Sequence, residues 1–312
     1  AARGGNWLIE PLERRARAGM AFIPVCFGTF LLLWLGRSHW AEWANQPGLH
    51  NAAWLNPGFL FTRDALALLL FWWTAARFAR SRNPRSGENS GIPTFVNSVG
   101  PISYRPSSGG SAGMLAFVYC LVFSLLGFDL VMALDPHWFS SLFGAYFFIT
   151  GLYTAIAAWT FSVLLEKPAV DAAHRKDLAK LIVAFSLLST YMMFCQLIPI
   201  WYENLPEEVR FVIPRLRISP WRWVSLGLLA TVYLGPLLLL LPNRAKGSIC
   251  YLRAIVLLLL TGMWLERWWL VTPTLGGAFA IGLPEAGATA AFLAAFIMSI
   301  RRFSRMTREP AP

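Results

Sequence analysis

The sequence predicts an all-α integral membrane protein, a helical bundle that crosses the bilayer about eight times. Of its 312 residues, 56% are hydrophobic and only 14% are charged. Soluble domains are typically about 45–50% apolar and about 25% charged. The apolar residues gather in long runs, and most Lys and Arg residues lie between these runs, as expected if lipid covers most of the surface.

Eight apolar runs are long enough to cross a bilayer. A spanning helix needs about 20 mostly apolar residues and satisfies its own backbone hydrogen bonds in lipid. The predicted spans are roughly Gly19–Leu35, Phe59–Phe78, Met114–Leu134, Ser141–Leu165, Leu178–Trp201, Trp221–Leu241, Leu252–Val271 and Ala278–Ile300.

Basic residues alternate between the segments that join these runs. They concentrate before the first span, after the second, fourth and sixth spans, and in the C-terminal tail. Three of the opposite loops, Ser38–Gly58, Asp135–Ser140 and Thr272–Gly277, contain no Lys or Arg, and only Tyr202–Pro220 breaks the pattern. The positive-inside rule therefore predicts that both termini are cytoplasmic. The net charge of +11 is then topological, and we expect no nucleic-acid partner.

Histidine and cysteine positions argue against a cofactor held by this chain. A membrane haem is usually held by histidines at membrane depth, but His39, His50, His137 and His174 fall in loops or at span ends. The four cysteines form no C-x-x-C motif. We therefore expect no haem, iron–sulfur cluster or metal here.

Ionisable residues inside the predicted spans are the first candidates for a functional site, because a charge in lipid is costly and usually faces protein or water. Asp129 lies within the third span, Glu266 within the seventh beside Arg267, and Asp64 near the outer end of the second beside Arg63. Adjacent helical residues point about 100° apart, so we expect each charge to find its partner on another helix. Proton transfer and structural ion pairing are both open for these residues, and a proton-carrying role is favoured for Asp129, which has no basic residue within one helical turn.

Two polar segments at predicted outer span ends are further candidates. Asp135 and His137 follow the third span, and Tyr202 and Glu203 end the fifth, just before two further glutamates. Histidine can relay protons near neutral pH, but a capped turn and a solvated acidic helix end explain the same residues. If the chain binds a quinone, His137, Asp135 and Tyr202 are the predicted contacts.

Several ordered motifs resemble one membrane-protein family. They are FDLVMALDPHWFSSLFGAYFF, which begins at Phe128, and DLAKL, QLIPIWYENLPEEVRF, MWLERWWLVTP and IGLPEAGATAAF further on. They resemble the NrfD-like (polysulfide-reductase-type) membrane subunits of alternative complex III, a quinol:cytochrome c oxidoreductase. The match runs from about Glu10 to the C-terminus and favours the F-type subunit over the homologous quinol-binding C-type subunit.

The resemblance implies two four-helix sub-bundles, roughly residues 10–165 and 178–303, in a bacterial cytoplasmic membrane. It implies partners: a homologous quinol-binding membrane subunit, a multihaem cytochrome c, an iron–sulfur subunit and lipids. It implies a cofactor-free chain that contributes proton half-channels. The family's polar positions correspond to Asp129, Asp135, His137, Asp177, Tyr202 and Glu266. Here Glu266 stands where the family tends to have Asp, and Glu203 where a small residue is usual.

Three alternatives to proton transfer stay open at this point. The chain could be a purely structural scaffold for redox partners, a quinol-binding subunit, or a stand-alone secondary transporter. The last has little support, because no convincing inverted repeat is visible.

Overall fold

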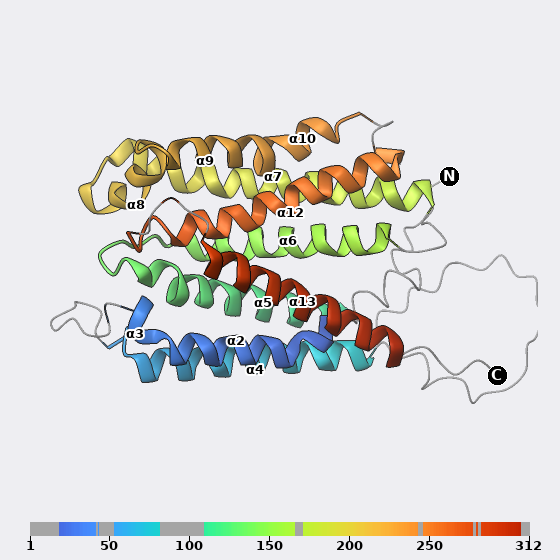
Figure 1. Cartoon of the computed structure of the whole chain (residues 1–312), viewed down its shortest axis with the longest axis horizontal. Coiled ribbons are helices and arrows are strands. Elements are labelled where there is room, and N and C mark those ends of the chain that lie inside the picture. Colours follow the sequence, from blue (N-terminus) through green and yellow to red (C-terminus); the bar gives the residue numbers. More distant parts are fainter. Residues whose placement is uncertain are drawn as a thin grey trace, which may run out of the picture.

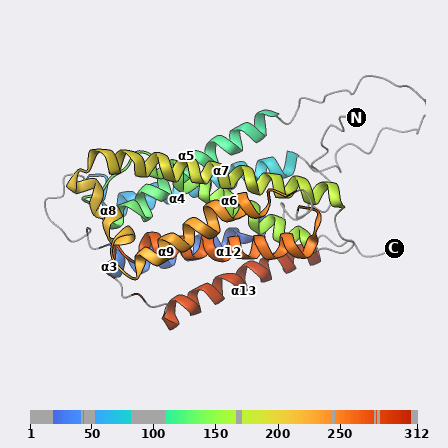
Figure 2. The same cartoon turned by 90° about the horizontal axis from the view of Figure 1, so that it is seen from above.

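A computed structural model describes residues 19–41, 43, 53–81, 109–165, 171–242, 246–276, 279 and 282–306. These residues form an elongated helical bundle with no strand among them (Figures 1 and 2). In chain order the elements are η1 Gly19–Phe22, α2 Ile23–Leu35, α3 Arg37–Trp40, α4 Pro57–Ser81, α5 Gly109–Leu130, η5 Met132–Leu134, α6 Phe143–Leu164, α7 Ala172–Glu203, α8 Pro206–Leu216, α9 Trp221–Leu228, η6 Leu229–Leu234, α10 Gly235–Leu239, α12 Ile249–Val271 and α13 Leu283–Met306.

Six helical segments of the described chain are long and apolar enough to cross a membrane: α4, α5 with η5, α6, α7, the continuous run α9–η6–α10, and α12. The 23 residues of α12 rise about 35 Å at about 1.5 Å per residue, against a hydrocarbon core of about 30 Å. The other two predicted spans are helical, but their apolar parts, Gly19–Leu35 and Glu285–Ser299, are shorter. A multi-pass membrane protein is therefore supported, whereas the count of eight stays a prediction.

The main hydrophobic core lies around α6. Its buried residues include Phe143, Tyr153 and Ala157 of α6, Ile182 of α7 and Leu259 of α12. The prediction of two four-helix sub-bundles is not confirmed, because α6, assigned to the first, shares this core with helices assigned to the second.

A smaller core joins the N-terminal helices. Leu68 of α4 packs with Val118, Val122 and Leu126 of α5, and Phe27 of α2 lies against them. Helix α13 returns to this side of the molecule, where the Phe22 ring of η1 lies 5.8 Å from the Phe296 ring and 6.3 Å from the Phe292 ring. The last described helix therefore packs against the first.

Large apolar side chains cover the outer surface of the helices. Leu66, Leu69 and Trp73 of α4 are each more than half exposed. A soluble monomer rarely exposes extended apolar patches, so this surface fits contact with lipid or with other membrane chains.

Basic side chains satisfy backbone carbonyls at the end of the bundle predicted to be cytoplasmic. Arg253 of α12 donates to Leu164 O at the C-terminus of α6, and Arg175 of α7 donates to Gly247 O at 3.0 Å. Cations stabilise helix C-termini, where carbonyls lack partners. Most other residues behind the orientation prediction lie outside the described residues, among them Arg14, Arg82 and Lys167, and so does His50.

Candidate functional site

The first buried polar cluster joins α4 to α5. Asp129, one residue before the end of α5, is fully buried and accepts from Arg63 Nη2 at 2.5 Å and Arg63 Nε at 3.2 Å. Trp54 Nε1 donates to the other Asp129 oxygen at 3.0 Å, and its ring centre lies 3.7 Å from the Arg63 guanidinium carbon. These three residues and Asp64 are called the Asp129 cluster below.

Asp64 gives the Asp129 cluster an excess of negative charge. Its side chain is fully buried beside Asp129, with Oδ1 4.0 Å from Arg63 Nε, and neither carboxylate oxygen has a hydrogen-bond donor among the described residues. Two carboxylates thus share one guanidinium. Because burial of a net charge is costly, one proton bound by the two carboxylates would make the cluster neutral.

The second buried cluster joins α6, η6 and α12. Glu266, five residues before the end of α12, is fully buried and accepts a hydrogen bond from the hydroxyl of Tyr146. The Tyr146 and Tyr233 hydroxyl oxygens lie 2.7 Å apart, and Arg267 Nε lies 3.4 Å from the second Glu266 oxygen. These four residues are called the Glu266 cluster below.

Hydrogen-bond donors in the Glu266 cluster have one consistent order. A tyrosine hydroxyl has one hydrogen, and Tyr146 donates its hydrogen to Glu266. In the bond between the two tyrosines, Tyr233 must therefore donate to Tyr146. The Tyr233 hydroxyl oxygen can therefore accept a hydrogen bond from a further donor at the end of this chain of hydroxyls.

A π-helical segment positions Tyr233. Pro236 lacks the N–H that would bond the Val232 carbonyl in an α-helix, and the Tyr153 hydroxyl donates to that carbonyl at 3.3 Å. Ser186 donates to the Tyr233 carbonyl at 2.6 Å. Isolated π turns within α-helices often occur at functional sites. Here side chains of α6 and α7 bind the carbonyls of the irregular segment.

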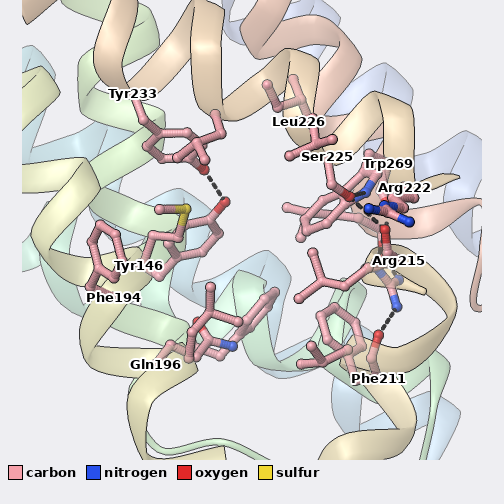
Figure 3. A pocket seen from close by; sticks show the side chains of 18 residues that line it. Tyr146, Phe194, Gln196, Phe211, Arg215, Arg222, Ser225, Leu226, Tyr233 and Trp269 are labelled. Carbon is pink, nitrogen blue, oxygen red and sulfur yellow. Dashed lines mark hydrogen bonds between the residues drawn. The ribbon is translucent and has the colours of Figure 1, made fainter. Parts of the chain in front are cut away.

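A cavity of about 310 Å³ adjoins the Glu266 cluster. Figure 3 shows Tyr146 and Tyr233 in one wall, hydroxyls toward each other, and Phe211 and Arg215 in the opposite wall. A second cavity of about 380 Å³ shares four of its lining residues: Phe194, Leu197, Val212 and Leu216. The two cavities therefore follow one another along α7 and α8, and both are lined mainly by apolar side chains.

Arg215 closes the far wall and corrects the prediction of a plain outer loop at Tyr202–Pro220. That segment contains helix α8, and Arg215 is buried, donating to Phe211 O at 2.6 Å, Leu270 O at 2.8 Å and Trp269 O at 3.2 Å. Burial lowers the pKa of the Arg215 guanidinium to about 9, and Asp135 partly opposes that shift. The guanidinium is therefore charged at neutral pH. Arg215 accounts for one of the three arginines of this segment, while Arg210 pairs with Asp135 and Arg217 is exposed.

The predicted outer candidates lie apart from both clusters. Asp135 forms a 2.9 Å ion pair with Arg210 and accepts from the backbone N–H of His137, whose side chain is exposed. Helix α5 ends at Leu130, so Asp129 and Asp135 do not lie on one continuous helix.

Three further candidates lie at the surface. Tyr202 is 82% exposed, Glu203 is exposed at the end of α7, and Asp177 pairs with Lys180 at 2.9 Å. None of the residues predicted to contact a quinone, His137, Asp135 or Tyr202, lines either of the two cavities.

Partners on other helices were predicted for the buried charges, and the structure supports this for Arg63. For Arg267 the prediction is only partly correct. Arg267 Nη2 donates to Thr150 of another helix, α6, at 2.7 Å, but Arg267 also contacts its own neighbour Glu266. Sequence reasoning missed the Glu266 partners Tyr146 and Tyr233. Two tyrosines within predicted spans, one of them three residues before a proline, were the available signal.

Among the described residues, no group of three or more His, Cys, Asp or Glu side chains could hold a metal ion. No protein-family model matches the chain, and no curated protein matches it.

Proposed function

We propose that this chain is a cofactor-free membrane subunit of a quinol-oxidising electron-transfer complex of the alternative complex III type. It would lie in a bacterial cytoplasmic membrane, transfer protons through the Glu266 cluster and anchor periplasmic redox subunits. The partners under this proposal are a homologous quinol-binding subunit, a multihaem cytochrome c and an iron–sulfur subunit. The observation that carries the proton-transfer role is a buried carboxylate joined by two hydroxyls to a cavity.

The order of donors in the Glu266 cluster suits proton uptake from the cavity. A donor beside Tyr233 passes its proton to the Tyr233 oxygen, Tyr233 passes its own to Tyr146, and Tyr146 passes its own to the Glu266 carboxylate. Each transfer breaks one O–H bond and forms another, so both tyrosines end neutral. Arg267, 3.4 Å from Glu266, stabilises the carboxylate before the proton arrives.

The Asp129 cluster supports a different role within the same subunit. Asp129 has three hydrogen bonds from Arg63 and Trp54, and these favour a fixed structural contact between α4 and α5. A purely structural scaffold is therefore the second candidate function, and it predicts that neither cluster affects proton movement.

The test uses the intact complex, purified through a tag on this chain and reconstituted in proteoliposomes. Co-purification of a multihaem cytochrome with an iron–sulfur subunit is expected, and an active chain without such companions would refute the assignment. In the complex, Glu266→Gln should slow proton transfer by about a hundredfold, the usual order for loss of a proton-transferring group. Normal proton movement in that variant would favour the scaffold.

A further inference from the structure

Three arginines give the two adjoining cavities a positive charge. Arg215 and Arg222 line the first cavity and Arg217 lines the second, and no Asp or Glu is among the described residues that line either one. Figure 3 shows Arg215 and Arg222 in the wall opposite the Tyr146–Tyr233 pair. All three arginines lie at the turn that joins α8 to α9. The charge is therefore concentrated at this turn, beside an otherwise mainly apolar space.

Within the described part of the chain, no carboxylate forms an ion pair with these three arginines. Arg215 is buried and donates to three backbone carbonyls and to the Thr274 hydroxyl, all of them neutral groups. The side chains of Arg217 and Arg222 are exposed, and neither donates a hydrogen bond to another described residue. Because charge that is withdrawn from water is costly without a partner, an anion at this turn would stabilise it.

Exposed tryptophans indicate that this turn lies at the level of the lipid head groups. Trp201 lines the second cavity and is 81% exposed, and the 66% exposed Trp223 has its ring centre 5.8 Å from the Arg222 guanidinium carbon. Tryptophan is enriched at both membrane–water interfaces. The candidate span Ala172–Glu203 ends near this turn, and the span Trp221–Leu239 begins there. An anion bound at this depth is therefore a lipid phosphate.

We propose that the two cavities together bind one anionic phospholipid. Its phosphate binds Arg217 and Arg222, because planar guanidinium groups suit phosphate oxygens. Its acyl chains lie along the apolar walls and enter from the bilayer past Phe194, Ile198 and Leu216, which line the cavities and are exposed. The cavity volumes of about 310 and 380 Å³ fall in the usual range of ligand pockets, about 300–1,000 Å³.

The test titrates the purified full chain, in detergent with any subunits that accompany it, and counts bound lipid by native mass spectrometry. Dioleoylphosphatidylglycerol is anionic, whereas dioleoylphosphatidylcholine has the same acyl chains and phosphate but no net charge. The anionic lipid should bind about tenfold more tightly, because choline offsets part of the attraction to two arginines. Arg217→Gln and Arg222→Gln should each weaken its binding about fivefold, which corresponds to about 1 kcal/mol per arginine.

Arg77→Gln is the matched control for these substitutions. Arg77 of α4 is exposed, and its guanidinium carbon lies 4.9 Å from the ring centre of the exposed Trp73, much as Arg222 lies over Trp223. Arg77 lines neither cavity, so its loss should leave the affinity for dioleoylphosphatidylglycerol unchanged. Equal weakening by Arg77→Gln and Arg222→Gln would show only a general attraction of anionic lipid to basic residues and would overturn the proposal.

The acyl chains are tested separately with Leu216→Trp. Leu216 lines both cavities and is 42% exposed, so the larger ring should occupy the space of the chains and weaken binding of both lipids about tenfold. Leu239→Trp, at a similarly exposed position outside the two cavities, should leave binding unchanged. Normal binding in Leu216→Trp would place the lipid outside the cavities and contradict the proposal.

Glycerophosphate distinguishes a lipid site from a site for free phosphate. It has a phosphate without acyl chains, so a large excess of it should not displace dioleoylphosphatidylglycerol. Displacement, or equal affinity of the unsubstituted protein for the two lipids, would overturn the proposal. The site is independent of the proposed proton path, because Glu266 lines neither cavity. Glu266→Gln should therefore bind the anionic lipid normally, and its effect on proton movement tests the proposed function separately.

Discussion

The Asp129 and Glu266 clusters both bury a carboxylate beside an arginine, yet they differ in what else touches the acid. Asp129 accepts two bonds from Arg63 and one from Trp54. In the Glu266 cluster, Arg267 Nε lies 3.4 Å from one Glu266 oxygen, and the Tyr146 hydroxyl donates a hydrogen bond to the other. Asp129, held by fixed donors, stabilises a helix contact, and a proton bound in its cluster is shared with Asp64. Glu266 lies at the end of a chain of hydroxyls through which a proton can reach it from the cavity.

The largest expected effect lies in the Asp129 cluster. Arg63→Met leaves two buried carboxylates without their guanidinium, and breaking a buried pair typically costs about 3–5 kcal/mol. The free energy of unfolding, measured in a denaturant titration of the purified protein, should fall by that amount. Adding Asp129→Leu should recover at least half of the loss, and no recovery would show that Arg63 stabilises the fold through other contacts.

The close approach of α12 to η6 gives the next largest effect. A Cβ at Gly262 would lie 2.6 Å from Val232 Cγ2, next to Tyr233. Gly262→Ala should therefore cost about 1–3 kcal/mol of unfolding free energy, as overpacking does, and should slow proton transfer by displacing Tyr233.

Gly227→Ala is the matched control for that substitution. A Cβ at Gly227 meets no atom within 4 Å, so the change should be neutral or stabilising by about 0.5–1 kcal/mol. Equal destabilisation by both alanines would refute the importance of the α12–η6 contact.

Tyr146→Phe tests the hydrogen bonds of the Glu266 cluster. It deprives Glu266 of its donor and Tyr233 of its acceptor, so unfolding should become easier by about 1–3 kcal/mol. Tyr251→Phe, which removes a 3.1 Å bond to Leu239 O near the start of α12, is the control: it should destabilise less and leave proton transfer unchanged.

The smallest effect concerns a carboxylate outside both clusters. The His174 side chain, and then its backbone N–H, lower the pKa of the exposed Asp171 at the start of α7. A carboxyl group whose pKa is lowered in the folded protein stabilises that protein at pH values above the group's ordinary pKa. This contribution disappears as the pH falls through the lowered pKa. Asp171→Asn should therefore slightly reduce the loss of thermal stability below about pH 4, whereas an unchanged pH profile would show that the contact contributes nothing.

The membrane class and the helix positions could be predicted from the sequence because lipid requires long apolar helices. Burial of Asp129, Asp64 and Glu266 was also predictable, since each interrupts an apolar run. Orientation was predicted from charges that mostly lie outside the described residues, so it stays a prediction.

The partners of the buried acids could not be predicted in the same way. Which residues face Glu266 depends on how α6, η6 and α12 pack, and the π turn at Leu229–Leu234 changes the direction of Tyr233. The burial of Arg215 could not be predicted either, because helix α8 buries a residue that its position in the sequence assigns to a polar loop.

The most direct test of the account compares proton transfer in two variants of the reconstituted complex. We expect Glu266→Gln to lower the rate of proton transfer by about a hundredfold while keeping its Tyr146 hydrogen bond and most of its stability. We expect the double variant Arg63→Met with Asp129→Leu to transfer protons at the normal rate per folded complex. Normal transfer in Glu266→Gln, or its loss only in the double variant, would contradict the assignment of the proton path to the Glu266 cluster.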